Sequence, residues 1–369
     1  MESRRTPPAK AFAAASLVCA VVASVVLACV GCTQNAAGPS GQESSPSSSQ
    51  TAFIAPEDML AVQEADFTPP PPPEPEPEPE PEPLRHFPTG SELRGLSGAT
   101  EPFAFALAEE DEGVALSSAS ASAIGETVTV FDQADWKSGY LLVDLETGRG
   151  IAGNIDERVF GASAIKGPFV HFLCEKWLDT GKASLEDEVT VGEKTMTLKE
   201  AVEDAIIKSG NESYKVLFST YSAGWATWVG ELGVGSEFNS HQRNPYYTAR
   251  ESALMWLAAY NYVNAEGDAR GQHAQWLSEM LSDTQVSFMR HAIAGGDVTV
   301  ASKPGWYATP EDSEYDMDSF CEAGIVSEGG HDYLLTVMTD AAYKGTIENA
   351  FEDIIQAVWS ARHDIAAEE

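Results

Sequence analysis

The 369-residue sequence predicts an α+β fold in which an antiparallel sheet is flanked by helices and carries a helical subdomain. Two observations favour this fold class. Short segments rich in β-branched and aromatic residues occur before and after a helical middle region, and an amphipathic helix follows the last of them. Strands, helices, strands and a final helix in this order indicate a sheet with helices packed against it.

The first clear structure is expected near Thr127. Val128–Phe131 and Gly139–Leu145 have the composition of strands, and the sequence ETG at 146–148 is typical of a turn. The preceding residues, 96–124, are small, acidic and weakly patterned, and they form a lead-in without a structural prediction. We therefore place the folded domain at residues 125–369.

The middle of this domain has two clear helix starts. Thr197 with Glu200, and Thr248 with Glu251, have the spacing of capping boxes. Apolar residues at helical spacing follow both starts. They are Leu198, Ala201, Val202, Ala205 and Ile206 in the first segment, and Leu254, Leu257, Ala258 and Tyr262 in the second.

Strands return in the last quarter of the chain. Val298–Ser302, Phe320–Val326 and Tyr333–Thr339 are short and rich in residues that favour strands. The final helix is expected from Ile347, and its apolar face consists of Phe351, Ile354, Ile355 and Val358.

The first 32 residues have the form of a bacterial lipoprotein signal peptide. Basic residues precede an uncharged apolar run from Ala11 to Val30, and a cysteine follows small residues at its end. Cys32 is the expected lipidation site, with Cys29 as the alternative. An uncleaved membrane anchor stays open because the run is close to the length of one span. We expect an exported protein, lipid-anchored at the outer face of the cytoplasmic membrane or in the cell envelope.

Residues 33–95 are expected to form a disordered stalk. They are dominated by Pro, Glu and Ser, and residues 69–83 end in alternating Glu-Pro. As a polyproline helix that block alone would extend about 45 Å. Such a segment would hold a domain away from a membrane.

Charge and cysteine content limit the partners. A formal net charge of -35 argues against a nucleic-acid partner, which requires a basic surface. Only Cys174 and Cys321 lie in the predicted domain, where either a disulfide or two buried thiols are compatible with the sequence. No metal pattern and no cofactor are indicated.

The strongest chemical signal is the sequence SAIK at 163–166. In a helical turn Lys166 lies on the same side as Ser163, so its amine could take the serine proton. Lys166 acts as a base only when neutral, and burial or a nearby positive charge such as Lys303 must therefore lower its pKa. Pro168 suits the first turn of a helix that begins near Gly167, which leaves Ser163 on an irregular turn.

Two further segments follow in order, SGN at 209–211 and KPGW at 303–306. Together with S-x-x-K, the chain from about 125 to 365 resembles the serine β-lactamase and penicillin-binding protein superfamily, whose motifs are S-x-x-K, S-D-N and K-T-G. The resemblance implies a class A β-lactamase-like serine hydrolase that acylates its serine with an amide or β-lactam carbonyl. The implied partners are cell-wall peptide or a β-lactam-like small molecule.

The resemblance also implies a role for each motif residue. Ser163 matches the acylated nucleophile, Lys166 its general base or proton relay, and Ser209 the group that passes the proton to the leaving nitrogen. Asn211, Lys303 and Gly305 match substrate-binding positions. The backbone N–H groups of Ser163 and Trp306 would form the oxyanion hole.

The sequence departs from the family pattern at several positions. Gly210 replaces the usual Asp, Pro304 replaces a Thr that binds a substrate carboxylate, and Trp306 replaces a small residue and would narrow the groove. Glu237 is a candidate deacylation base in a loop that looks shortened, with a solvated loop carboxylate as the alternative. These departures motivate an alternative function, a catalytically impaired β-lactamase-fold module that binds cell-wall components.

Other candidates favour structural roles. His171 has no evident partner carboxylate, and we expect a hydrogen-bonded helical histidine rather than a catalytic base. The aromatic cluster is expected in the core, with a groove lining as the alternative. It comprises Trp225, Trp228, Tyr246, Tyr247, Trp256 and Tyr260.

Overall fold

The computed structural model describes residues 85–366, with gaps at 110, 112, 268–269, 294, 314–316 and 344–346. The expected signal peptide, both candidate lipidation sites and the stalk up to residue 84 lie outside the described residues. Within residues 85–366, outside those gaps, no helix combines the length and apolarity that a membrane span requires.

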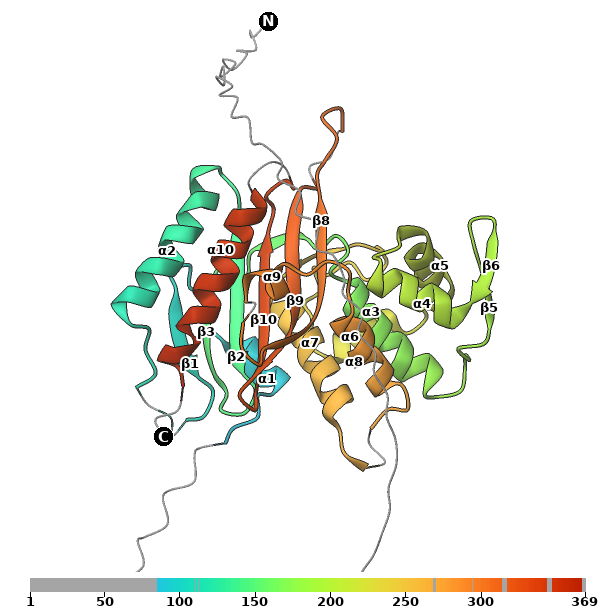
Figure 1. Cartoon of the computed structure of the whole chain (residues 1–369), viewed down its shortest axis with the longest axis horizontal. Helices are drawn as coiled ribbons and strands as arrows, with labels where there is room; N and C mark the ends of the chain where they lie inside the picture. Colours follow the sequence, from blue (N-terminus) through green and yellow to red (C-terminus); the bar gives the residue numbers. More distant parts are fainter. Residues whose placement is uncertain are drawn as a thin grey trace, which may run out of the picture. The chain divides into compact units, whose positions relative to one another are not determined.

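A six-stranded sheet forms the centre of the fold, as Figure 1 shows. All neighbouring strands are antiparallel and the order is β1-β3-β2-β10-β9-β8, which confirms the predicted α+β fold class. The strands are β1 (Phe103–Ala106), β2 (Ser138–Asp144), β3 (Arg149–Gly153), β8 (Thr299–Tyr307), β9 (Ser319–Glu328) and β10 (His331–Thr339).

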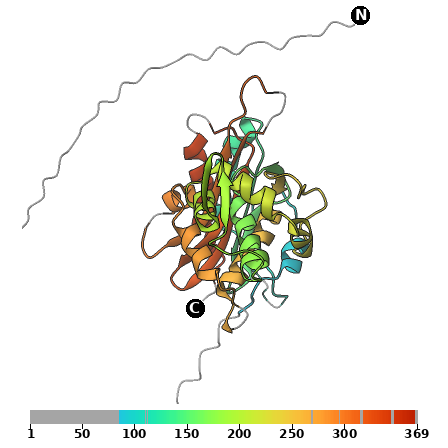
Figure 2. The ribbon, with the colours of Figure 1, turned by 90° about the vertical axis from the view of Figure 1, so that its right-hand side faces the viewer.

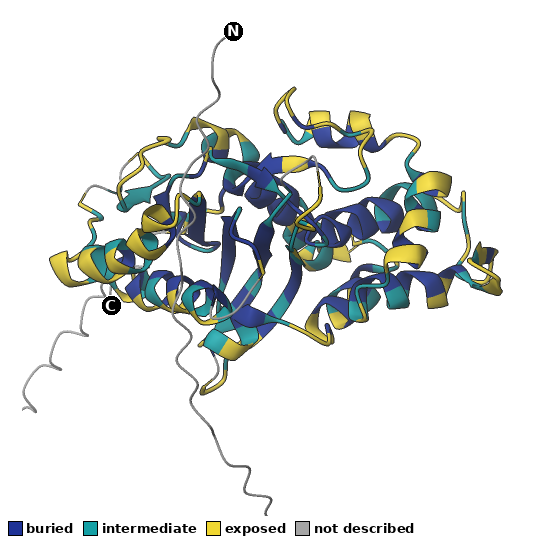
Figure 3. Ribbon diagram, turned by 90° about the horizontal axis from the view of Figure 1, so that it is seen from above, coloured by how far each residue is buried: buried dark blue, intermediate teal, exposed yellow. Residues whose placement is uncertain are grey.

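Helices cover both faces of this sheet. On one face α2 (Ser118–Gln133) and α10 (Ile347–Ser360) lie side by side and bury Phe131, Phe351 and Ile354 against it, and a 3-10 turn (Ala361–Asp364) follows α10. On the other face α7 (Ala249–Asn264) packs against β2, β9 and β10. Figure 3 shows the strands mostly buried between the helices, whose outer surfaces carry the exposed residues.

The remaining helices form the expected subdomain beside the sheet. Its helices are α3 (Lys166–Leu173), extended by a π-helical turn (Cys174–Leu178), α4 (Leu198–Ile207), α5 (Asn211–Tyr221), α6 (Trp225–Glu231) and α8 (Ala274–Ser282). The short helix α9 (Phe288–Ala292) instead packs against α10 and β8. The hairpin of β5 (Glu188–Val191) and β6 (Lys194–Thr197) projects from the subdomain in Figure 1 and faces the viewer in Figure 2. A second short pair joins β4 (Arg158–Phe160) to β7 (Tyr246–Thr248).

Both predicted capping boxes are present. The hydroxyls of Thr197 and Thr248 accept hydrogen bonds from the backbone N–H groups of Glu200 and Glu251. The side chains of both glutamates in turn accept a hydrogen bond from the backbone N–H of the capping threonine. The apolar residues predicted after Thr197 are all buried. Local signals therefore fixed these two helix starts.

The predicted strand Val128–Phe131 is wrong, because these residues belong to α2. Ser117 caps this helix, and Ile124 and Phe131, two turns apart on one face, are fully buried. The hydroxyl of Thr127 donates to the Ile124 carbonyl at 2.7 Å. Burial of this apolar face outweighs the strand preference of the β-branched residues, which favour strands only weakly without their tertiary neighbours.

The folded region also begins earlier than residue 125. Residues 90–95, expected in the stalk, form the short helix α1 (Gly90–Gly95), whose Leu93 is fully buried. The Arg250 guanidinium on α7 donates to the Leu93 carbonyl at 2.6 Å. Strand β1 pairs with β3 at the edge of the sheet, so the lead-in contributes a strand as well.

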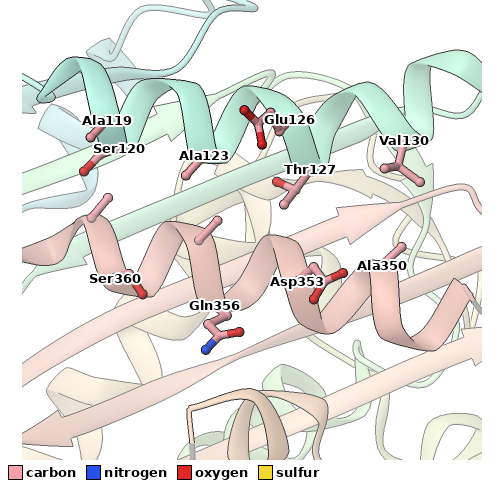
Figure 4. A pocket seen from close by; sticks show the side chains of 12 residues that line it. Ala119, Ser120, Ala123, Glu126, Thr127, Val130, Ala350, Asp353, Gln356 and Ser360 are labelled. Carbon is pink, nitrogen blue, oxygen red and sulfur yellow. The ribbon is translucent and has the colours of Figure 1, made fainter.

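Small side chains line the outer side of the α2 and α10 pair. Ala119, Ala123, Ala350 and Ala357 are among the residues that line an open groove of about 620 Å³ between the two helices, shown in Figure 4. This groove lacks the three motifs and is separate from the site described next.

Candidate active site

Ser163 lies on a turn between β4 and α3. The turn is strained, since Ala162 has a φ of 44° in the left-handed region. The Asn244 side-chain amide donates to the Ala162 carbonyl at 2.6 Å, and the Pro245 carbonyl accepts from Gly161 N–H at 3.1 Å. The segment that contains Asn244 therefore holds the turn that presents Ser163. As expected, Ser163 precedes the regular helix.

Lys166 is fully buried at the start of α3, and its amine reaches the loop between α4 and α5. Its Nζ donates to the Ser209 carbonyl at 2.7 Å and to Asn211 Oδ1 at 2.9 Å, and it lies 3.4 Å from Ser209 Oγ. Ser209 has a φ of 57°, which turns its carbonyl towards this amine. Among the hydrogen bonds of the described residues, none joins Lys166 Nζ to Ser163 Oγ.

Lys303 approaches the same loop from β8. Its Nζ donates to Ser209 Oγ at 3.1 Å and to the Pro304 carbonyl at 2.9 Å. The hydroxyl of Ser209 therefore lies between two buried lysine amines that come from α3 and from the sheet. The three predicted motifs meet at this point.

Gly305 allows β8 to lie directly against the Ser163 turn. A Cβ at this position would lie 2.3 Å from Ala164 N, 2.6 Å from Ser163 N and 2.8 Å from the Gly161 carbonyl oxygen. These distances are too short for any side chain. The absence of a side chain at 305 therefore brings the end of β8 close to the backbone N–H of Ser163.

The electrostatic environment lowers the pKa of both lysines. Burial, followed by the positive charges of Lys303 and Arg243, lowers the pKa of Lys166 to about 7, while Asp204 acts in the opposite direction. Burial lowers the pKa of Lys303 to about 8, opposed by the buried Glu322. A substantial fraction of Lys166 is therefore neutral at neutral pH, as a general base requires.

A cavity of about 280 Å³ opens at the Ser163 turn. No carboxylate is among the described residues that line it, and its two cationic residues are Lys208 and Lys303. The Trp306 ring packs edge-on against Phe288 with ring centroids 5.6 Å apart, and Trp306 also lines the cavity. The complete lining is Ser163, Ile207, Lys208, Ser209, Asn211, Thr284, Gln285, Val286, Lys303, Pro304 and Trp306.

Glu237 does not line this cavity. Its side chain is 80% exposed and lies 3.2 Å from Arg158 Nε. This environment is that of a solvated loop carboxylate, and it offers no contact with the Ser163 turn through which Glu237 could activate a water. The same loop instead contributes Asn244 to the turn and places the Arg243 charge near Lys166.

His171 is fully buried in α3, and the expectation that it is hydrogen-bonded is wrong. Neither ring nitrogen has a hydrogen-bond partner, although the Glu175 carboxylate one turn later lies 3.7 Å from Nε2. Burial lowers the pKa of His171 to about 4, so the ring is neutral at neutral pH. His171 packs between the rings of Trp228 and Tyr262, which is a structural position.

Most of the predicted aromatic core is buried, namely Trp225, Trp228, Tyr247 and Trp256, whereas Tyr246 is exposed. Cys174 and Cys321 are buried free thiols, so the disulfide alternative is wrong. The described part of the chain contains no cluster of three or more His, Cys, Asp or Glu side chains suited to a metal ion.

Three residues at the site were missed from the sequence. Asn244 holds the Ser163 turn, Arg243 acts on Lys166 through its charge, and the Asp204 backbone carbonyl accepts from Gly210 N–H in the SGN loop. Each belongs to a helix or loop outside the motifs. The only available signal was the Asn-Pro pair at 244–245, which is typical of a loop and indicates no chemistry.

Residues 122–361 match the sequence model described as the beta-lactamase enzyme family. The chain belongs to the beta-lactamase enzyme family. The match spans well over half of the 369 residues and contains all three motifs. A search of curated proteins found no match.

Solved structures of this family share the fold of the chain. PBP-A is 17% identical, with a TM-score of 0.55 over 66% of this chain and 96% of PBP-A. A beta-lactamase from Chitinophaga pinensis is 16% identical, with a TM-score of 0.56 over 66% of this chain and 99% of the other. A mutant of PBP-A, solved as an acyl-enzyme complex with penicillin G, is 17% identical with a TM-score of 0.53 over 66% and 96%.

Proposed function

We propose that this member of the beta-lactamase enzyme family is a cell-envelope serine hydrolase that acts by acylation of Ser163. The observation that carries the proposal is the convergence of Lys166 Nζ and Lys303 Nζ on the Ser209 hydroxyl, beside a cavity that Ser163 lines. The lowered pKa of Lys166 supports a base that is ready to accept a proton.

In the proposed reaction, Ser163 Oγ attacks a carbonyl carbon and its proton passes to neutral Lys166. The oxyanion that forms is stabilised by the backbone N–H groups of Ser163 and Trp306. When the C–N bond breaks, the proton leaves Lys166 through Ser209 Oγ to the departing nitrogen. Lys303 stabilises the negative charge of the substrate, and Asn211 binds its amide group.

The substrate class follows from the charges at the cavity. Lys208 and Lys303 favour a substrate with an anionic group, and the penicillin G complex of the PBP-A mutant supports a β-lactam-like compound. A cell-wall peptide is the other substrate that the family resemblance implies. Pro304 lacks a hydroxyl for a substrate carboxylate, so Lys208 and Lys303 would bind this group without it. A larger share of the recognition then depends on the two amines.

Acylation is expected to be faster than release of the acyl group. Hydrolysis of an ester on Ser163 needs a base that activates water, and no carboxylate lines the cavity among the described residues. Glu237 is bound to Arg158 instead. We therefore propose a long-lived acyl-enzyme that is hydrolysed slowly.

A lipid anchor at Cys32, or at Cys29, would hold the domain at the outer face of the cytoplasmic membrane. The proposal rests on the apolar run and the cysteines at its end. Fractionation of cells that express the full chain tests it. Recovery in the membrane fraction that is lost in a Cys29→Ser/Cys32→Ser variant supports the anchor, whereas release into the medium by both proteins overturns it.

A second candidate function is a catalytically impaired module that binds cell-wall components. The missing hydroxyl at Pro304 and the absence of a carboxylate from the described cavity lining favour it. This module would bind peptidoglycan fragments without covalent change. Its affinity would be the same in Ser163→Ala as in the wild type.

Intact-mass spectrometry distinguishes the two functions. The soluble domain is incubated with a panel of penicillins and an acyl-D-Ala-D-Ala peptide, and the mass is followed over time. The proposed hydrolase gains one acyl group that persists for minutes, and Ser163→Ala gains none. Unchanged mass with every compound, together with binding of peptidoglycan fragments, would support the impaired module instead.

A further inference from the structure

The middle position of the SGN loop has no room for a side chain. A Cβ on Gly210 would lie 1.9 Å from Asp204 Oδ2 and 2.8 Å from Asp204 Cγ, and 3.2 Å from the Asp204 carbonyl oxygen. The volume beside Gly210 is therefore filled by the carboxylate of a residue on α4. The SGN loop contains no acidic residue, but the Asp204 carboxylate lies beside its central residue, Gly210.

Asp204 connects the two helices that flank this loop. Its Oδ2 accepts from the Ser213 hydroxyl on α5 at 2.6 Å, and its backbone carbonyl accepts from Gly210 N–H at 2.9 Å. The Lys208 amine lies 3.7 Å from its Oδ1. The end of α4, the loop and the first turn of α5 therefore share one anchoring residue.

The position of this anchor matters for the lysine amines. Ser209 and Asn211 lie on either side of Gly210, and both bind Lys166 Nζ. Asp204 is also the one negative charge among the groups that shift the pKa of Lys166, where it opposes Lys303 and Arg243. Removal of Asp204 would therefore change both the geometry of the loop and the balance of charge around Lys166.

We propose that Asp204 is a positioning residue of the active site, and that its carboxylate takes the place of a side chain at position 210 and holds Ser209 and Asn211 against Lys166. This inference rests on the proposed function for its catalytic consequence. Its structural consequence does not, because the contacts of Asp204 with Gly210 and Ser213 exist without a substrate. A carboxylate attached at 210 would fill the same volume if Asp204 were removed.

A reciprocal exchange tests the proposal. Asp204→Ala removes the anchor, and Gly210→Asp introduces a clash with Asp204. We expect each single variant to slow acylation at least about tenfold, because a shift of about 1 Å in catalytic groups lowers a reaction rate by this much or more. The double variant Asp204→Ala/Gly210→Asp is expected to recover most of the rate. Glu212→Gln removes an exposed charge beside the same loop and serves as the matched control. A double variant no faster than the slower single variant would overturn the proposal.

A second readout separates charge from packing and needs no substrate. Asp204→Asn keeps the shape and a hydrogen-bond acceptor for Ser213 but removes the charge, so the ¹³Cε signal of Lys166 is expected to titrate at a lower pH than in the wild type. Glu212→Gln should leave this titration unchanged. If the wild type reacts with no acylating compound, this titration and the recovery of thermal stability in the double variant still decide the inference. An unmoved titration together with no recovery of stability would overturn it.

Discussion

The repulsion between the two buried lysines gives a quantitative prediction. Their amines lie 3.4 and 3.1 Å from the same Ser209 oxygen, so they are at most about 6.5 Å apart. Two unit charges at that distance repel each other by roughly 2.5 kcal/mol at an effective dielectric constant of about 20. This energy corresponds to a shift of about 2 pKa units. Lys303→Gln removes this repulsion and keeps a hydrogen-bond donor for Ser209.

We expect the pKa of Lys166 to rise by about one to two units above its value of about 7 in this variant, because burial and Arg243 continue to lower it. The pH titration of ¹³Cε signals in lysine-labelled protein measures the change, and Lys166→Met assigns the signal. Lys215→Gln, which removes an exposed lysine on α5, is the control. A wild-type pKa near 10.5, or the same pKa in both proteins, would refute the reasoning.

Further predictions concern stability, the glycine on β8, the loop glutamate and the free thiols. The pKa of Lys166 in the folded protein lies below its ordinary value of 10.5, so the unfolded chain binds more protons between about pH 7 and 10. The contribution of Lys166 to the free energy of unfolding therefore increases as pH rises through this window. Urea titrations should show a weaker increase in Lys166→Met than in the wild type. Gly305→Ala should lower the free energy of unfolding by about 1–3 kcal/mol and slow acylation. Gly125→Ala is the control and should do neither, because its added methyl group meets open space. Equal behaviour of the two variants would contradict the close approach of β8 to the Ser163 turn. Glu237→Gln should leave the lifetime of the acyl-enzyme unchanged, and a longer lifetime in pulse-chase mass spectrometry would identify it as the deacylation base. Both cysteines are buried and their thiol pKa values are raised, so a thiol reagent should label the folded protein only at its unfolding rate.

Local signals predicted much of the fold. The capping boxes at Thr197 and Thr248 act over a few residues, and their helices begin where expected. Strands β9 and β10 and the helix from Ile347 were found from composition and periodicity. The strand prediction at Val128–Phe131 failed because the orientation of Phe131 is decided by distant packing partners on the sheet and α10. A short β-branched run does not by itself distinguish a strand from a helix.

The site was predictable as far as its motifs extend. Ser163, Ser209 and Lys303, which the family pattern implied would lie together, line one cavity, and their catalytic roles stay predictions. Asp204 and Asn244 could not be found, because their contacts with the motif residues depend on how helices and loops come together in space. Glu237 was predicted from its position in the sequence as a candidate deacylation base, but its side chain contacts Arg158 and solvent.

A crystal structure of the domain with a boronic acid that mimics a β-lactam carbonyl tests the central claim most directly. We expect a tetrahedral boron bonded to Ser163 Oγ, with one oxygen held by the backbone N–H groups of Ser163 and Trp306 and with Lys166 Nζ and Ser209 Oγ facing the adduct. A boronate bound elsewhere, or an adduct whose oxygen points away from both N–H groups, would contradict it.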